Sequence, residues 1–368
     1  MLNRRDFARL AAAASACSAL PASLLAQAGA PLKKIRYAPV GLGLISVDHF
    51  MPGTRMGQYG EITGLVSGTP EKAKRLAAEY KVPDGNIYTY ETFDKIKDNP
   101  DIDAVYIGLP NNMHAEYTIR AAEAGKHVLC EKPMAVNVKE CEQMIAACKK
   151  HNRKLMIAYR CHLQSSHMQA RDLIRSGAMG KVEAIEGAAG FNIAHGVWRT
   201  KRQFAGGGPL MDIGIYALNA ARFVLGEDPS DISAYSSTVD HDDRFVDIEE
   251  NVSWTMKFPS GAVASMTTTY GANQEGFLRV HCSGGVVEID GFGYSGISLK
   301  VQKRGRGVNE ETVQTDNGKD PYQFAIESDY FSQAVMNNTA IEPSGEEGLK
   351  DMQAIAKIYA SAGGHKPA

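Results

Sequence analysis

A glycine-rich turn between a short strand and a helix constrains this chain more than any other stretch. Residues 35–41 (IRYAPVG) form a β-rich run, and residues 41–46 (GLGLIS) open a helix directly after it. In such a G-x-G-x-x-small turn, the first glycine makes the turn and the second lets the backbone approach a pyrophosphate. Ser46 is small enough for helix and strand to pack closely. The pattern therefore predicts the first βα unit of a dinucleotide-binding sheet.

The residues that follow alternate between β-rich and helix-like segments. They are a strand at 62–68, a helix at 70–80, a strand at 103–109, a helix at 112–125, a strand at 127–130, a helix at 137–152 and a strand at 154–160. This alternation predicts a doubly wound parallel sheet, which binds ligands at the carboxyl ends of its strands. We therefore assign residues 35–155 to an N-terminal Rossmann domain.

The end of the second strand indicates which dinucleotide is bound. An NAD enzyme usually has an acidic residue there, which bonds the ribose 2′-hydroxyl. Here the strand ends in Ser67-Gly68-Thr69, and Lys72 and Arg75 follow in the next helix. A hydroxyl, a helix N-terminus and two cations suit a 2′-phosphate, so the sequence favours NADP. Both cations, Arg75 above all, could instead be solvated helix charges.

Two further strand ends deliver polar residues to the same edge. Residues 109–111 (LPN) precede His114, and residues 131–133 (EKP) follow the next strand. Asn111 could simply cap a helix, and His114 could be a surface histidine in its first turn. Lys132 follows an apolar strand and precedes a proline that restricts its backbone, so we expect it to point into the crevice.

From residue 156 onward the pattern changes to sequential strands. The expected elements are a helix at 167–177, a strand at 181–192, a series of strands between about 231 and 314, and helices at about 321–337 and 346–361. Sequential β runs joined by short turns predict a large, mostly antiparallel open sheet. Residues 156–368 would then be an α+β domain for substrate binding and oligomerisation, and the fold class of the whole chain would be α/β.

One stretch of this second domain places an acid and a phenol on the same predicted helix face. Residues 206–219 read GGGPLMDIGIYALN, with Asp212 and Tyr216 four positions apart. That spacing is one helical turn. We expect the glycines to let the backbone approach a ligand closely, because any side chain would obstruct it. Tyr216 could also be a core aromatic, since its neighbours at helical spacing are apolar.

The first 28 residues have the pattern of an export signal. Paired arginines precede an alanine-rich stretch that ends in residues 26–28 (AQA), an A-x-A cleavage site. Residues 3–7 (NRRDF) are similar to a twin-arginine signal, whose pathway exports folded proteins; the alternative is an uncleaved amphipathic tail. We therefore expect a periplasmic or secreted protein with no membrane association in its mature form.

Charge and cysteine content argue against several classes of protein. The formal net charge is −2 and no basic stripe is visible, so nucleic acid is not an expected partner. Six cysteines are present, and Cys17 would leave with the signal. The other five have no paired spacing, which argues against a disulfide framework and suits folding in a reducing compartment before export. No C-x-x-C or H-x-x-x-H pattern indicates a metal site.

These motifs resemble those of the Gfo/Idh/MocA oxidoreductase family, in particular its glucose-fructose oxidoreductase branch. The resemblance covers nearly the whole chain after the signal and rests on the turn at 41–46, EKP at 131–133, and GGG at 206–208 with Asp212 and Tyr216. Most members have histidine where Tyr216 stands, and tyrosine is the variant of this branch. The resemblance implies an enzyme with NADP that oxidises an aldose at C1 to its lactone.

Such an oxidation gives the motif residues expected roles. A base must accept the proton of the C1 hydroxyl, and a phenol becomes a base when a nearby ammonium lowers its pKa. We expect Lys132 to act in this way on Tyr216, and Asp212 to orient Lys132 or bond a sugar hydroxyl. These three are the expected catalytic residues. The resemblance adds Arg160, after the strand at 154–160, to the expected substrate contacts.

The expected cofactor contacts come from the strand ends and from the loop before the glycines. Trp198 and Arg199 could stack on cofactor or sugar, or could be a buried indole beside surface arginines. The full set is Gly41, Leu42, Gly43, Leu44, Ser67, Gly68, Lys72, Arg75, Leu109, Pro110, Asn111, His114, Glu131, Lys132, Arg160, Trp198, Arg199 and Tyr322.

Export limits how the reaction can proceed, because no free NADP pool exists outside the cytoplasm to replace the reduced cofactor. We expect tightly bound NADP and a ping-pong cycle in which one aldose becomes a lactone and a second sugar, fructose or another aldose, becomes a polyol. The alternatives are an aldose 1-dehydrogenase with dissociable NADP, a noncatalytic NADP or sugar sensor, and glycosidase-like chemistry with transient redox. The resemblance implies a homodimer, with a tetramer as the alternative.

Overall fold

The computed structural model describes residues 32–304, 309–315 and 320–363. From Lys34 onward the chain forms one compact unit, which contains two β-sheets. The expected export signal at residues 1–28 lies outside the described residues, and the domain boundary at 155/156 stays a prediction. Within the described ranges, no helix has the length and apolarity needed to cross a bilayer.

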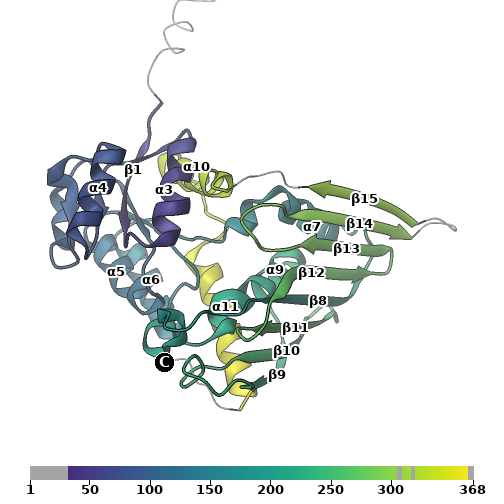
Figure 1. The fold of residues 1–368 in the computed structure, drawn as a ribbon. Helices are drawn as coiled ribbons and strands as arrows, with labels where there is room; N and C mark the ends of the chain where they lie inside the picture. The colour runs from purple at the N-terminus through teal and green to yellow at the C-terminus, as the bar shows by residue number, and fades with distance from the viewer. Residues whose placement is uncertain (1–31, 305–308, 316–319, 364–368) are drawn as a thin grey trace, which may run out of the picture. The chain divides into compact units, whose positions relative to one another are not determined.

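The first sheet is parallel throughout, as expected (Figure 1). In the described part of the chain it has seven strands, ordered β4-β3-β1-β5-β6-β7 with β2 beside β1. The strands are β1 Ile35–Val40, β2 Gly60–Ile62, β3 Leu65–Val66, β4 Ile87–Tyr88, β5 Ala104–Ile107, β6 His127–Cys130 and β7 Leu155–Ile157. Its main helices are α4 Pro70–Tyr80, α5 His114–Glu123 and α6 Val138–Lys150. The predicted Rossmann architecture is confirmed.

Two local features of this sheet differ from the prediction. The expected strand at 62–68 is split into β2 and β3, because the N–H groups of Thr63 and Gly64 both bond to the one carbonyl of Tyr37. This shared acceptor shifts the register between the two pieces. The glycine turn is followed by a π-helical turn at Ile45–Phe50 and then by α3, Met51–Met56, neither of which was expected from the sequence.

The second sheet is open and mostly antiparallel, as predicted. Its described strands lie in the order β15-β14-β13-β12-β8-β11-β10-β9, and only the β8–β11 pair among them is parallel. The strands are β8 Val182–Gly190, β9 Asp231–Ser237, β10 Asn251–Lys257, β11 Val263–Thr269, β12 Gln274–Cys282, β13 Gly285–Asp290, β14 Ser298–Arg304 and β15 Asn309–Thr315. Strand β10 alternates buried Trp254 and Met256 with exposed Thr255 and Lys257, the pattern of a sheet covered on one face.

Helices cover that buried face. They are α7 Ser165–Arg175, α9 Ile215–Leu225 and α11 Gly345–Ser361, which contact β13, β8 and β9 respectively (Figure 1). Helix α10, Tyr322–Met336, instead packs against α3 of the first domain. The last two helices were expected at nearly these positions. Through α10, a segment near the end of the chain returns to the first sheet.

Removal from water lowers the pKa of three histidines away from the cavity. The pKa falls to about 4 for the partly buried His127 and to about 3 for the buried His162 and His167. Neither ring nitrogen of His167 has a hydrogen-bond partner among the described residues. Each ring is therefore neutral in the folded protein at neutral pH but takes a proton below about pH 6.5 in the unfolded chain.

The unfolded state consequently gains protons first as the pH falls, so acid should destabilise the fold. Between about pH 6.5 and the lowered pKa, each histidine costs about 1.4 kcal/mol of unfolding free energy per pH unit. Replacing His167 with methionine should remove one such contribution without breaking a hydrogen bond. We expect the Tm of His167→Met to fall less than that of the wild type between pH 7 and pH 5; parallel curves would contradict this account.

Candidate active site

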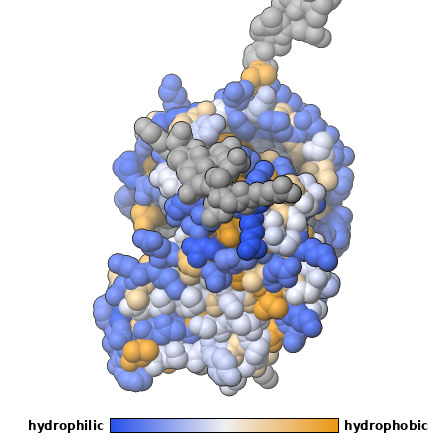
Figure 2. Space-filling model, turned by 90° about the vertical axis from the view of Figure 1, so that its right-hand side faces the viewer, coloured by the Kyte–Doolittle hydropathy of each residue, from blue (hydrophilic) through white to orange (hydrophobic). Residues whose placement is uncertain are grey.

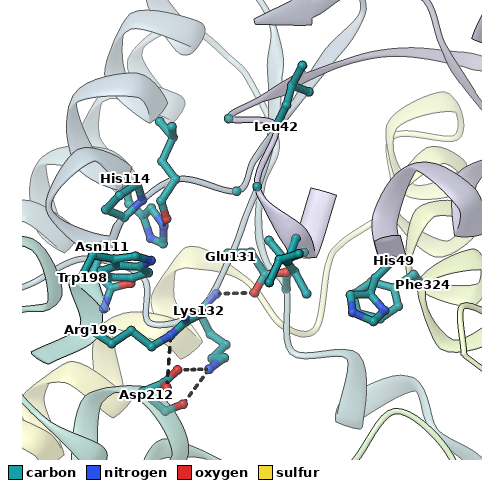
Figure 3. A pocket seen from close by; sticks show the side chains of 18 of the residues that line it. Leu42, His49, Asn111, His114, Glu131, Lys132, Trp198, Arg199, Asp212 and Phe324 are labelled. Atoms are coloured by element: carbon teal, nitrogen blue, oxygen red, sulfur yellow. Dashed lines mark hydrogen bonds and ion pairs between the residues drawn. The ribbon is translucent and has the colours of Figure 1, made fainter. Parts of the chain in front are cut away.

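A cavity of about 850 Å³ opens between the carboxyl ends of the parallel strands and the loops of the second domain. Every expected cofactor contact except Arg75 and Tyr322 lines this cavity, as do Asp212 and Tyr216. Figure 3 shows Lys132 and Arg199 pointing toward Asp212, with Asn111, His114 and Trp198 grouped on one side. The motifs at 41–46, 131–133 and 212–216 thus meet at one place.

The structure does not bring Arg75 or Tyr322 to the cavity. Arg75 is exposed on α4, whose buried face is formed by Ala73, Leu76 and Ala77. Its position matches that of a solvated helix charge. Tyr322 is 48% exposed at the start of α10, whereas Phe324, two residues later, lines the cavity. Of these two aromatic residues at the start of α10, the structure therefore places Phe324, and not Tyr322, at the cavity.

The glycine turn has the geometry that a pyrophosphate cradle requires. Gly41 has φ +88°, and a Cβ there would lie 2.7 Å from Leu109 Cδ2. A Cβ on Gly43 would meet open space, its nearest neighbour being the Gly108 carbonyl oxygen at 3.9 Å. Ser46 Oγ donates a 2.6 Å hydrogen bond to the Gly41 carbonyl, which fixes the helix against the turn. The residues present therefore fit a dinucleotide.

Replacing Gly41 with alanine should weaken dinucleotide binding. The left-handed backbone alone costs a residue with a Cβ about 1–2 kcal/mol, and the clash with Leu109 adds to this cost. A strained turn would weaken dinucleotide binding by at least about tenfold. The affinity of the Gly41→Ala protein for NADP checks this prediction. Gly125→Ala is the control, because Gly125 also has a left-handed backbone (φ +75°) but does not line the cavity.

The end of the cavity next to Ser67 and Lys72 is lined by groups that can donate hydrogen bonds and, among the described residues, by no acidic side chain. Ser67 Oγ accepts a 3.0 Å bond from the Thr69 N–H, and Lys72 Nζ donates 3.2 Å to the Leu42 carbonyl. Tyr90 also lines this end, and its ring packs against Gly68. The lining carboxylates, Glu131 and Asp212, come from other segments of the chain. A cation and hydroxyls with no opposing acid suit a phosphate group.

His114 and Asn111 have contacts that the sequence left open. The His114 ring is fully buried, with Nδ1 2.9 Å from the Pro133 carbonyl and Nε2 3.0 Å from the Leu109 carbonyl. Burial lowers its pKa. It therefore ties two strand ends together at the cavity wall and is not a surface histidine. Asn111 Nδ2 donates 2.9 Å to the Ala205 carbonyl and so links the two domains.

Lys132 and Asp212 form the polar centre of the cavity. Lys132 Nζ donates 2.6 Å to the Asp212 carbonyl and 3.3 Å to Asp212 Oδ1. The other carboxylate oxygen accepts 2.7 Å from the Tyr270 hydroxyl and lies 3.3 Å from Arg199 Nε. Although burial opposes ionisation, these cations and the hydroxyl lower the pKa of Asp212. Of the two expected roles for Asp212, the contacts match the orientation of Lys132.

The contacts of Tyr216 differ from the expectation that Lys132 makes it a phenolate. Lys132 Nζ lies over the Tyr216 ring, 4.6 Å from its centroid, and Arg160 is the cation that acts most strongly on the phenol. Burial outweighs this cation and raises the pKa of Tyr216 above that of an ordinary tyrosine. Tyr216 therefore stands in the cavity wall as a neutral phenol, a proton donor at neutral pH.

Arg160 is held in place by the protein itself. Its Nη1 donates 2.8 Å to the Gly293 carbonyl and 2.6 Å to Gln323 Oε1, and its Nη2 donates to the Phe292 carbonyl. Its guanidinium carbon lies 5.3 Å from the Tyr216 ring centroid. Arg160 thus anchors the loop at 291–296 and approaches Tyr216, so most of its donors are already used.

An aromatic wall on this side of the cavity was not expected from the sequence. It consists of His49, Phe292, Tyr294 and Phe324, and Figure 3 shows His49 beside Phe324. The Tyr294 ring centroid lies 4.6 Å from the Arg160 guanidinium carbon. Aromatic residues in the glycine-rich segment GFGYSG (291–296) were the one signal in the sequence that could have indicated this wall.

The glycines at 206–208 do not have the expected role. None of them lines the cavity. A Cβ on Gly206 would lie 2.8 Å from Val136 Cβ, one on Gly207 would meet the Tyr359 hydroxyl, and one on Gly208 would meet Glu249. Protein atoms, not a ligand, therefore require glycine here. After the turn, Asp212 lies in a π-helical segment, Leu210–Gly214, and Tyr216 lies in α9.

Comparison with known proteins was consistent with this geometry. Residues 35–159 match the NAD-binding Rossmann fold of the GFO/IDH/MocA oxidoreductase family, and residues 167–288 match the GFO/IDH/MocA C-terminal domain. The chain is 32% identical to D-xylose 1-dehydrogenase [NADP(+)] of Haloarcula marismortui over 333 residues, 88% of this chain and 90% of that protein.

Solved structures of sugar oxidoreductases have a similar fold. The aldose-aldose oxidoreductase of Caulobacter crescentus, complexed with glycerol, superposes with a TM-score of 0.85 at 42% identity, covering 90% of this chain and 98% of that one. A levoglucosan dehydrogenase in complex with NADH and L-sorbose gives a TM-score of 0.79 at 23% identity, which covers 91% and 98% and shows a shared fold.

Proposed function

The chain belongs to the GFO/IDH/MocA oxidoreductase family and is an NAD(P)-dependent sugar oxidoreductase, and from this premise we propose that it works as an aldose-aldose type enzyme. It oxidises an aldose at C1 to the aldonolactone and reduces a second sugar, an aldose or fructose, to a polyol. The observation that carries this proposal is the meeting of Lys132, Asp212 and Tyr216 in a cavity whose other end fits a dinucleotide.

NADP is the cofactor that these residues suit. Gly41 and Gly43 would hold its pyrophosphate, and Ser67 and Lys72 would face its 2′-phosphate, since Ser67-Gly68-Thr69 at the end of the second strand includes no acidic residue. When bound, its nicotinamide supplies hydride-transfer chemistry in both half-reactions. Two NADP(+)-dependent D-xylose 1-dehydrogenases, from Haloarcula marismortui and Haloferax volcanii, are among the relatives.

The side chains around the sugar bind it and transfer the proton of its C1 oxygen. Lys132 and Tyr216 hydrogen bond the C1 oxygen and hold the sugar against the cofactor side of the cavity. In the reducing direction the neutral phenol of Tyr216 donates its proton to the developing alkoxide. In the oxidising direction its phenolate form, favoured by Arg160, accepts the proton of the C1 hydroxyl. Asp212 keeps Lys132 in place through the carbonyl and carboxylate contacts.

Different pH dependences follow for the two half-reactions. Because the pKa of Tyr216 is raised, oxidation of the aldose needs the minor, deprotonated form and should speed up by about tenfold per pH unit near neutrality. Reduction uses the abundant phenol and should be nearly independent of pH there. Stopped-flow measurement of each half-reaction between pH 6 and pH 9 tests this; equal slopes in both directions would contradict it.

We further propose that the enzyme is exported with NADP already bound and does not release it during turnover. The twin-arginine pattern at residues 3–7 supports export, and the cysteines in the described residues are all unpaired thiols, as expected for folding under reducing conditions. A bound cofactor without an external pool requires a ping-pong cycle, because the second sugar must regenerate it.

A dimer through the open sheet completes the proposal. The exposed face of this sheet carries a ladder of charges in which Arg279 pairs with Glu186 and Glu288, and Glu288 pairs with Lys300. Tyr235 and Val263 are exposed on strands of the same sheet. Figure 2 views the molecule from the right-hand side of Figure 1. On the described part of that side, hydrophobic residues lie in separate spots among hydrophilic ones. Native mass spectrometry gives the subunit number directly.

One alternative activity has a specific observation behind it. The resemblance to D-xylose 1-dehydrogenase [NADP(+)] favours an enzyme that releases NADPH after each oxidation. Ultrafiltration followed by an assay without added NADP distinguishes the two. Turnover of an aldose and a second sugar without added cofactor supports the ping-pong enzyme, and strict dependence on added NADP supports the dehydrogenase.

A further inference from the structure

A buried carboxylate holds the glycine turn that precedes the catalytic helix. Both oxygens of Glu249 accept the Gly208 N–H, each at 3.1 Å. The Tyr359 hydroxyl, from the C-terminal helix α11, donates 2.6 Å to Glu249 Oε1. Glu249 is 2% exposed and Tyr359 1% exposed. The Gly208 N–H and the Tyr359 hydroxyl thus share one buried acceptor, so the turn is fixed from two distant parts of the chain.

The glycines are what allow this arrangement. A Cβ on Gly207 would collide with the Tyr359 hydroxyl, and one on Gly208 would lie 2.9 Å from the Glu249 carboxyl carbon. Gly206 has φ +79°, a backbone conformation that side chains disfavour. The GGG of the sequence is therefore complementary to Glu249 and Tyr359, two residues outside the cavity that no motif connects with it.

The turn determines where the catalytic groups lie. Met211 N–H bonds to the Gly208 carbonyl at 3.1 Å, so the π-helical segment starts directly from the clamped residue. Lys132 Nζ in turn donates its 2.6 Å hydrogen bond to the backbone carbonyl of Asp212, four residues after Gly208. A shift of the turn would move this carbonyl and, with it, Lys132 and Tyr216.

We propose that Glu249, supported by Tyr359, is a positioning residue for hydride transfer: it fixes the glycine turn so that Asp212 and Tyr216 meet Lys132 in the reactive arrangement. This role rests on the proposed function, since it needs the reaction at Lys132 and Tyr216 to be the one described above. It adds two residues that neither touch the cavity nor belong to the motifs of the family resemblance.

Three substitutions test the proposal in graded steps. Glu249→Ala removes both acceptors, Glu249→Gln keeps one acceptor oxygen and the shape, and Tyr359→Phe removes a single donor. We expect the single-turnover rate of bound-NADP reduction by an aldose to fall by about 100-fold in Glu249→Ala and about tenfold in the other two, because small misplacements of reacting groups cost rate. Bound NADP content and the KM for the aldose should change little.

Glu250 offers a matched control. It is 4% exposed, and its carboxylate accepts the N–H groups of Val239 and Asp240 in a different loop. Glu250→Gln should lower the Tm by a similar amount to Glu249→Gln but leave the single-turnover rate near the wild-type value. Hydrogen exchange of the peptide 206–216 should increase in the Glu249 variants and stay unchanged in Glu250→Gln.

The outcomes separate this proposal from the proposed function. If Glu249→Gln and Tyr359→Phe reduce their NADP at the wild-type rate, or if Glu250→Gln slows it equally, the positioning role is overturned while the function stands. If the wild-type protein does not reduce its NADP with any aldose, the proposed function fails, and this role falls with it. Should Glu249→Ala not fold, the other two variants still decide the question.

Discussion

Tyr216→Phe should retain NADP and lose hydride transfer. Removal of the hydroxyl eliminates the group that exchanges a proton with the sugar oxygen, which is expected to slow both half-reactions by about 10²- to 10⁴-fold. The ring itself should stay in place, because it stacks on Phe292 at 20° and is nearly fully buried. The reduced-nicotinamide absorbance after mixing with an aldose measures the rate directly.

Tyr37 provides the control for this substitution. Its hydroxyl is also fully buried and bonds to Ser332 at 2.8 Å and to the Ser328 carbonyl at 3.2 Å, but it does not line the cavity. Tyr37→Phe should cost stability and leave the rate of hydride transfer unchanged. Normal turnover by Tyr216→Phe would remove Tyr216 from the mechanism and would leave the fold assignment intact.

Lys132→Met should slow hydride transfer nearly as much as Tyr216→Phe and should also raise the pKa of Asp212. The loss of a charged donor at the sugar oxygen is expected to slow hydride transfer by about 10²- to 10³-fold. Asp212 would keep Arg199 and Tyr270 but lose the cation that contributes most to its lowered pKa. The pKa of Asp212 should therefore be higher in Lys132→Met than in the wild type, which an NMR titration of this carboxyl group measures.

Lys126 is a suitable comparison for Lys132. It is 7% exposed, and its Nζ donates 2.9 Å to the carbonyls of Asn99 and Ile102, outside the cavity. Lys126→Met should lower the Tm and preserve hydride transfer. If both lysine variants lost activity in proportion to their stability, a chemical role for Lys132 would be contradicted.

The parts of the fold that follow from local signals could be predicted from the sequence. Helix α4, Pro70–Tyr80, matches the predicted segment because proline at its start and a regular apolar face are local properties. The split between β2 and β3 could not be predicted, since it depends on the Tyr37 carbonyl in another strand. Many cavity residues could be predicted because they directly follow parallel strands, whose carboxyl ends lie at the same edge of the sheet.

The residues that were missed are those that distant segments bring together. His49, Tyr294 and Phe324 meet because α10 and the loop at 291–296 pack against the π-helical turn Ile45–Phe50, an arrangement that no local pattern encodes. The same reason explains the difference at Tyr216: burial and Arg160 set its pKa, and neither can be inferred from the spacing of Asp212 and Tyr216. Glu249 was missed because the glycines indicated a ligand, whereas their partner is a protein carboxylate.

We propose that this enzyme retains its NADP throughout turnover, oxidising one sugar and then reducing a second. The most direct measurement is the absorbance of extensively ultrafiltered protein, with no added cofactor, on mixing first with an aldose and then with a second sugar. We expect the reduced-nicotinamide band to rise when the aldose is added and to disappear when the second sugar is added, with lactone and polyol formed in equal amounts. Protein that has lost its NADP on filtration, or a band that appears only when NADP is added, would contradict it.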